Sequence, residues 1–247
     1  MKINVFSLLV MIGLGTVVNA QTTGQFSTYT ANTADGGVSD ALYNYAMGDL
    51  TNKYDKAKSL DAGMEGSPYE SNSFAPAQLY FGEELVGNLY YRYNAYNEEI
   101  EIKQQNLEGE AIKGLSKDKK IRVLVNGKSR SFKTFIDKNG NTQNGYLTLL
   151  KDGKYKLYEH LGVVFKEAQK AQNTLVKSTP AKFSQFTEYY LESPDGSKIQ
   201  QLQLNNKKLL KIVGADSQEE LAKFLKTEKL KIKEINDLYQ VMDFLNQ

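Results

Sequence analysis

The residues best suited to binding chemistry lie in one stretch of the chain, from Leu79 to Lys103. Within it, Tyr90, Arg92 and Tyr96 could form a surface of two phenol rings beside a guanidinium. Such a surface stacks on sugar rings or on peptide. The sequence therefore predicts these three residues as a binding site. The alternative is that one face of the stretch is core and that neighbouring elements cover the other.

A pair of carboxylates in the same stretch offers a route to hydrolysis. Glu99 and Glu101 lie two residues apart, so on a strand their Cα atoms are about 6.5–7 Å apart. That separation falls within the range of glycosidase acid pairs. Lys103 follows on the same strand face, which favours a solvated charged surface instead. A hydrolase using the paired carboxylates remains an alternative function.

The sequence contains few residues that could bind a metal or act as an activated nucleophile. His160 is the only histidine and there is no cysteine, which excludes a zinc site of ordinary composition. We expect His160 to end a strand with its hydrogen bond satisfied. Asp137 to Asn141 begins like a calcium loop but lacks the later glycine and glutamate, so we interpret it as an Asn-Gly turn. We predict no catalytic residue, no metal and no cofactor.

The charge balance argues against a nucleic-acid partner. The formal net charge is +2, which gives no global field to attract a polyanion. Near the C-terminus the lysines are denser. This density is compatible with contact to anionic envelope polymers or phosphates, and equally with the charged face that any surface helix needs. These lysines are Lys207, Lys208, Lys211, Lys223, Lys226, Lys229, Lys231 and Lys233.

The N-terminal residues have the pattern of a signal peptide. Lys2 precedes an apolar run from Val5 to Val18, and small residues end at Ala20. This arrangement predicts export, with cleavage after residue 20. The run is shorter than the about 20 residues that span a bilayer, and no transmembrane segment is expected after signal removal. Because the chain has no cysteine, we expect a periplasmic or outer-surface protein of a Gram-negative bacterium.

Composition and periodicity divide the remaining chain into three parts. Residues 21–66 predict a flexible tether with a possible short helix, residues 67–204 an antiparallel β domain, and residues 205–247 a helical cap. In the β domain Leu89 alternates with Asn88, and the alternation continues along the strand. Hairpin turns are expected at Asn126-Gly127 and at later Gly-containing turns.

The C-terminal part changes to a helical period. A stripe beginning at Ile235 and Leu238 predicts one helix, and Ser217 with Glu220 predicts a capping box for another. The fold class is therefore α+β. We expect an antiparallel β-meander, arranged as a sandwich or a partly open barrel, with a C-terminal cluster of three short helices.

The run GSPYESNSFAPAQLYFGEELVGNLYYRYNAYNEEIEIK, the β-rich middle and the tail KLKIKEINDLYQVMDFLN together resemble an uncharacterised family of secreted β-rich envelope proteins of Gram-negative bacteria. The resemblance covers the chain from Gly66 to its C-terminus. It implies the fold and the location, and no activity is assigned to the family.

These observations favour an exported, non-enzymatic cell-envelope protein that acts as a protein- or glycan-interaction module. Its expected partner is an envelope protein or a glycan, and not nucleic acid. Two alternatives stay open. One is a small-ligand carrier built on a β-barrel, and the other is the hydrolase with paired carboxylates.

Overall fold

A computed structural model of the chain describes residues 45–48, 64–170 and 178–247. The predicted signal peptide and most of the predicted tether and its possible helix lie outside the described residues. Within the tether, the described residues Met47 and Gly48 form a strand. The described strands are β1 (Met47–Gly48), β2 (Ala75–Phe81), β3 (Glu84–Asn94), β4 (Glu99–Lys103), β5 (Lys113–Leu115), β6 (Ile121–Val125), β7 (Lys128–Ile136), β8 (Thr142–Lys151), β9 (Lys156–Lys166), β10 (Lys182–Glu192) and β11 (Ile199–Leu202). The described helices are α3 (Asn206–Ile212), α4 (Ala215–Thr227) and α5 (Ile235–Leu245).

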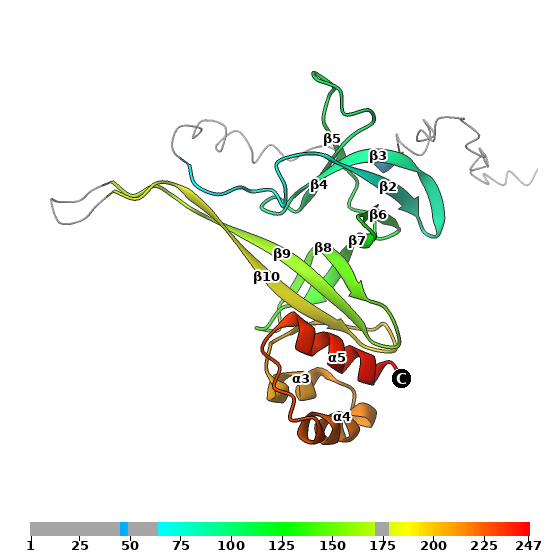
Figure 1. Cartoon of the computed structure of the whole chain (residues 1–247). Coiled ribbons are helices and arrows are strands. Elements are labelled where there is room, and N and C mark those ends of the chain that lie inside the picture. The colour runs from blue at the N-terminus through cyan, green and yellow to red at the C-terminus, as the bar shows by residue number, and fades with distance from the viewer. Residues whose placement is uncertain (1–44, 49–63, 171–177) are drawn as a thin grey trace, which may run out of the picture. The chain divides into compact units, whose positions relative to one another are not determined.

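The strands form one sheet that is open at one end and closed at the other. Their order is β1-β5-β4-β3-β2-β6-β7-β11-β10-β9-β8, and β7 also pairs with β8 (Figure 1). Strands β7 to β11 therefore close into a ring. Most neighbours are antiparallel, as the meander predicts, and β11 pairs with β7 in parallel. The α+β class with three short C-terminal helices is confirmed.

Side chains fill part of the inside of the ring. Each of its five strands contributes one buried residue to a single cluster. These residues are Phe135, Leu147, Tyr158, Tyr190 and Ile199, and none is more than 8% exposed. The same five strands also line a hollow of about 280 Å³, to which Phe135, Gln143, His160, Tyr190 and Gln201 contribute.

The open part of the sheet shows the predicted alternation. Leu89, Tyr91 and Tyr93 of β3 are buried, whereas Asn88 on the other face is exposed. The β4 partners of Tyr91 and Tyr93, which are Ile102 and Ile100, are equally buried. Cross-strand pairs of this kind stabilise both the sheet and its register. The predicted alternation along β3 is therefore confirmed, and the structure shows that the face of Leu89, Tyr91 and Tyr93 is the buried one.

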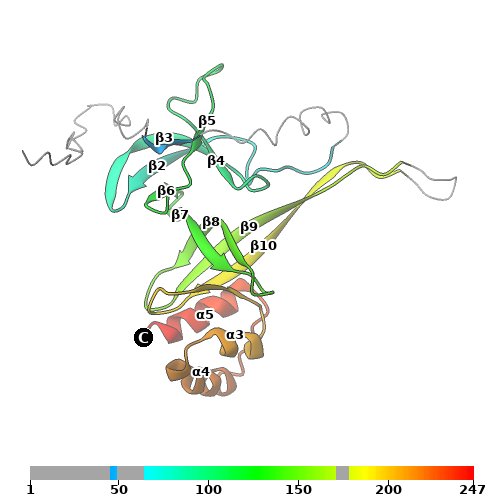
Figure 2. The same cartoon turned by 180° about the vertical axis from the view of Figure 1, so that it is seen from behind.

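The helices pack on the outside of the ring, as both views show (Figures 1 and 2). Leu157 of β9 and Leu191 of β10 share a core with buried residues of all three helices. The predicted apolar stripe of α5 is buried from Leu238 to Leu245. No helix among the described residues has both the length and the apolar character needed to cross a membrane.

One local prediction in this region is wrong. Helix α4 begins at Ala215, so Ser217 lies inside its first turn rather than at its N-cap. The Ser217 hydroxyl instead accepts a hydrogen bond from the Tyr155 hydroxyl at 3.3 Å. A capping box occurs at α5, between Glu234 and Asp237. The tertiary contact with Tyr155 therefore replaces the local cap that the sequence suggested.

Candidate functional site

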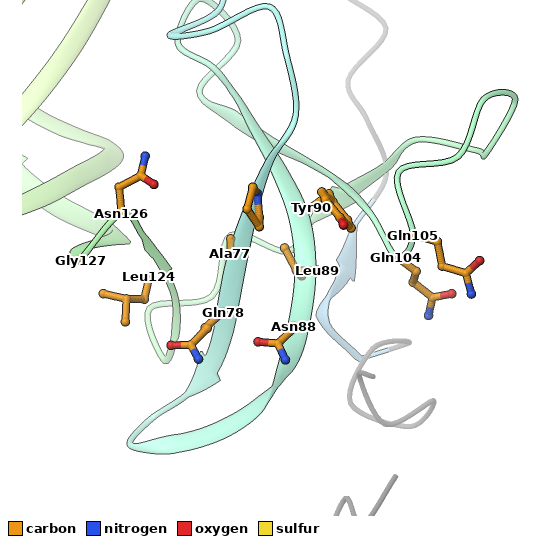
Figure 3. Close-up of a pocket in the computed structure, with 11 residues that line it drawn as sticks. Ala77, Gln78, Asn88, Leu89, Tyr90, Gln104, Gln105, Leu124, Asn126 and Gly127 are labelled. Carbon is orange, nitrogen blue, oxygen red and sulfur yellow. The ribbon is translucent and has the colours of Figure 1, made fainter. Parts of the chain in front are cut away.

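A hollow of about 610 Å³ lies on the solvent face of β2 and β3. Figure 3 shows Gln78 and Asn88 side by side on its floor, with Gln104 and Gln105 on one side and Asn126 on the other. The volume is within the range of small-molecule sites. Its lining residues are Pro76, Ala77, Gln78, Asn88, Leu89, Tyr90, Gln104, Gln105, Leu124, Asn126 and Gly127.

The lining has an unusual chemical composition. It contains the five carboxamides of Gln78, Asn88, Gln104, Gln105 and Asn126, together with one phenol. None of the described residues that line the hollow carries a carboxylate, an ammonium or a guanidinium. Each carboxamide offers both donor and acceptor atoms. The lining therefore combines uncharged polar groups with apolar side chains and one aromatic ring.

The alternation of side chains along β2 and β3 determines which residues form the floor of the hollow. Ala77 and Leu79 are buried in the core, which turns Gln78 between them toward solvent. The neighbouring strand presents Asn88 and Tyr90 on the same face, because Gln78 pairs with Asn88 and Pro76 pairs with Tyr90. The packed core beneath holds the backbone, so the polar side chains start from fixed positions.

One wall of the hollow is a loop held by a carboxylate. The Glu110 carboxylate accepts hydrogen bonds from the backbone N–H groups of Gln104 at 2.5 Å, Leu107 at 3.2 Å and Gln105 at 3.2 Å. The Lys103 ammonium donates to the Leu107 carbonyl at 3.0 Å.

Desolvation opposes the Glu110 charge, but these backbone N–H groups, with nearby Lys103, outweigh it and lower the pKa of the Glu110 carboxyl. The loop that carries Gln104 and Gln105 is therefore organised before a ligand arrives, which reduces the entropic cost of binding.

The three residues predicted from the sequence do not line one hollow of the described structure. Tyr90 lines the hollow above β2 and β3. Arg92 lines a second hollow of about 340 Å³, and its guanidinium lies between the rings of Tyr69 and Phe74, 4.2 Å and 4.4 Å from their centroids. Tyr96 is 39% exposed in a turn.

The ring of Tyr96 contacts the Phe183 ring edge-on, with centroids 5.3 Å apart. The site predicted from Tyr90, Arg92 and Tyr96 thus divides among three environments. The carboxamides that accompany Tyr90 were missed. Of these, Asn88 could have been found by extending the strand alternation, whereas the others come together only through strand pairing and loop placement.

The expectation that Glu99 and Glu101 form a solvated surface is wrong, because they are only 6% and 5% exposed. Glu101 accepts from the Arg92 guanidinium at 3.0 Å and 2.5 Å and from the Tyr69 hydroxyl at 3.1 Å. The physical reason is that Tyr69 and its neighbours fold over this part of β4. A carboxylate held in an ion pair and a further hydrogen bond is a poor general base.

The position expected for His160 is also wrong, because it lies within β9 rather than at its end. Its Nε2 atom is 2.7 Å from Glu98 Oε1, and its Nδ1 atom is 3.4 Å from Glu188 Oε2. Burial favours the neutral ring, but the hydrogen bonds to Glu188 and Glu98 outweigh this and raise the pKa of His160 to about 9. An imidazole that is protonated at neutral pH cannot serve as a general base.

No metal-binding group of three or more His, Cys, Asp or Glu side chains occurs among the described residues. Asp137 accepts the backbone N–H groups of Asn139 and Asn141, as expected of the predicted turn. Comparison with protein-family models, curated proteins and solved structures finds no match to this chain.

Proposed function

We propose that this chain is an exported, non-enzymatic protein of the cell envelope whose sheet acts as an interaction module for an uncharged glycan, bound in the hollow above β2 and β3. The observation that carries the proposal is the lining, which combines five carboxamides with the Tyr90 ring and no charged group. Export is supported by the N-terminal pattern of Lys2 followed by an apolar run.

A neutral sugar matches this lining in its chemistry. Each sugar hydroxyl is at once a donor and an acceptor, as is each carboxamide, so several pairs can be satisfied together. The C–H face of a sugar ring packs on an aromatic ring, which Tyr90 supplies beside Pro76. An anionic or cationic ligand would lose hydration without finding an opposite charge.

The strand pairing favours a glycan over an extended peptide. At Gln78, β2 pairs with both β3 and β6, and at Tyr90, β3 pairs with both β2 and β4. The backbone hydrogen-bonding groups are therefore used within the sheet at these positions. A peptide cannot add there as a further strand, which is how peptides commonly bind sheets.

The two alternatives have less support. A carrier needs a cavity inside the ring, where Phe135, Leu147 and their neighbours form a packed cluster. The hollow that the ring strands also line, of about 280 Å³, is smaller than the about 300–1,000 Å³ of ligand pockets. A hydrolase needs an available acid and base, but Glu101 is held by Arg92. His160 has a raised pKa and lies away from the hollow above β2 and β3.

A glycan microarray with neutral and acidic glycans tests the proposal. We expect binding to neutral glycans, and we expect Tyr90→Ala to weaken it about tenfold, the equivalent of about 1.4 kcal/mol for one stacked ring and its buried area. Gln78→Ala should weaken it severalfold. Tyr96→Ala is the matched control, because Tyr96 lies outside this hollow.

Three results would refute the proposal. The first is binding that Tyr90→Ala and Gln78→Ala leave unchanged. The second is a preference for acidic glycans. The third is an array without neutral binders combined with a peptide ligand whose affinity depends on Tyr90.

A further inference from the structure

The side chain of Asn206 joins two groups of lysines that are far apart in the sequence. Its amide nitrogen donates to the Leu230 carbonyl at 2.7 Å, and its amide oxygen accepts from the Ile232 N–H at 2.9 Å. These bonds attach the segment between α4 and α5 to the first residue of α3. Figures 1 and 2 show these elements at the C-terminal end of the chain. Lys207 and Lys208 therefore lie beside the lysines of residues 229–233.

Alternation turns the lysines of both segments toward solvent. In residues 229–233, Leu230 and Ile232 pack into the helical core, and the three lysines between and beside them are exposed. On α3 the buried residue is Leu209, and the lysines again are exposed. Together these side chains form what we call the lysine surface, which consists of Lys207, Lys208, Lys211, Lys229, Lys231 and Lys233.

The lysine surface is not neutralised by the described part of the chain. None of its six lysines forms an ion pair with a described residue, since every recorded pair involves other residues. Between residues 205 and 237 the chain has eight lysines and six acids, and two of these acids, Glu234 and Asp237, form the capping box of α5. Positive charge is therefore in excess in this region.

Folding alone does not favour this arrangement. The first turn of α3 has two lysines and no acidic residue, although the helix dipole favours acids there and disfavours cations. Lys207 and Lys211 are four residues apart, where like charges repel. An arrangement that opposes folding is consistent with selection for a partner that supplies negative charge.

We propose that the lysine surface docks on an anionic phospholipid bilayer. The segment from Asn205 to Gln247 contains no arginine, and lysines act as mobile point charges rather than as the forked donors of a defined phosphate pocket. Leu204, just before α3, is 38% exposed. An exposed leucine beside lysines suits the boundary between headgroups and acyl chains. This contact is independent of the glycan hollow.

Co-sedimentation with vesicles tests the proposal. Full-length protein should bind vesicles of phosphatidylglycerol mixed with phosphatidylcholine and should not bind phosphatidylcholine alone. Binding should fall sharply at about 1 M salt, where the screening length is about 3 Å. The variant Lys207→Glu/Lys208→Glu should bind at least about 20-fold more weakly, since each lysine contributes about fivefold.

The same variant shows whether the loss comes from misfolding. Because acidic residues in the first turn of α3 are favoured by the helix dipole, the Tm of the variant protein should be unchanged or higher. The control Lys117→Glu/Lys119→Glu makes the same charge change on exposed lysines of another loop and should retain binding. Equal loss in both variants, binding to phosphatidylcholine alone, or a preference for soluble polyphosphate over vesicles would overturn the proposal.

Discussion

The ion pair between Glu70 and Arg130 should be a sensitive polar contact of the described sheet. The Arg130 guanidinium donates to both Glu70 oxygens, at 2.6 Å and 2.7 Å, and to the Thr148 hydroxyl at 2.8 Å. It also contacts the Tyr91 hydroxyl and lies 4.4 Å from the centroid of the Tyr93 ring. The perturbation is Glu70→Gln, which removes the negative charge and leaves the arginine in place.

The expected cost follows from the exposure of the two partners. The Arg130 side chain is 6% exposed and that of Glu70 is 40% exposed. A fully buried pair costs about 3–5 kcal/mol when one partner is lost, whereas an exposed pair costs about 0–1 kcal/mol. Because water screens Glu70, we expect a loss of about 2 kcal/mol. That corresponds to a Tm decrease of about 4–8 °C for a chain of this size.

Thermal melting and urea unfolding, both followed by circular dichroism, measure this loss. The matched control is Glu83→Gln, since Glu83 is 98% exposed and lies 3.6 Å from Arg122. It should change stability by about 0.5 kcal/mol or less. The double variant Glu70→Gln/Arg130→Met should be less destabilised than the sum of the single variants. If Glu70→Gln cost no more than Glu83→Gln, the burial of Arg130 would not strengthen its ion pair with Glu70.

Two further predictions concern ionisable groups. The pKa of His160 is raised to about 9. Its contribution to the free energy of unfolding is therefore complete below pH 6.5 and is lost as pH rises from 6.5 to about 9. Urea unfolding should show a loss of up to about 3 kcal/mol over this interval, and a slope that persisted in His160→Gln would exclude this origin. Glu110→Gln should weaken glycan binding severalfold by loosening the loop of Gln104 and Gln105. Its melting temperature should change little, and wild-type affinity in this variant would contradict the role of the loop.

Local patterns predicted much of the β architecture. The alternation at Leu89 and Tyr91 depends only on neighbours in the chain, because successive side chains of a strand point to opposite faces. Asn126 and Gly127 both adopt positive φ, at 50° and 76°, as a two-residue hairpin turn requires. The buried stripe that includes Leu238 follows in the same way from the helical period.

The candidate site could not be predicted in the same way. Glu101 appeared solvated because nothing near it in the chain showed that Tyr69 would cover it. His160 lacked visible partners because Glu98 is 62 residues away and Glu188 is 28 residues away. Of the predicted binding residues, Tyr90 lies in the hollow, where it joins carboxamides from other segments.

The amino-acid sequence by itself determined which segments become strands or helices and which face of each is apolar, because period and turn chemistry act over a few residues. Tertiary structure alone decided that β11 meets β7, that Gln104 and Asn126 border one hollow, and that Asn206 draws two lysine segments together. Such contacts bring together residues that are far apart in the chain. A periodic pattern over a few neighbouring residues cannot predict which distant segments will meet.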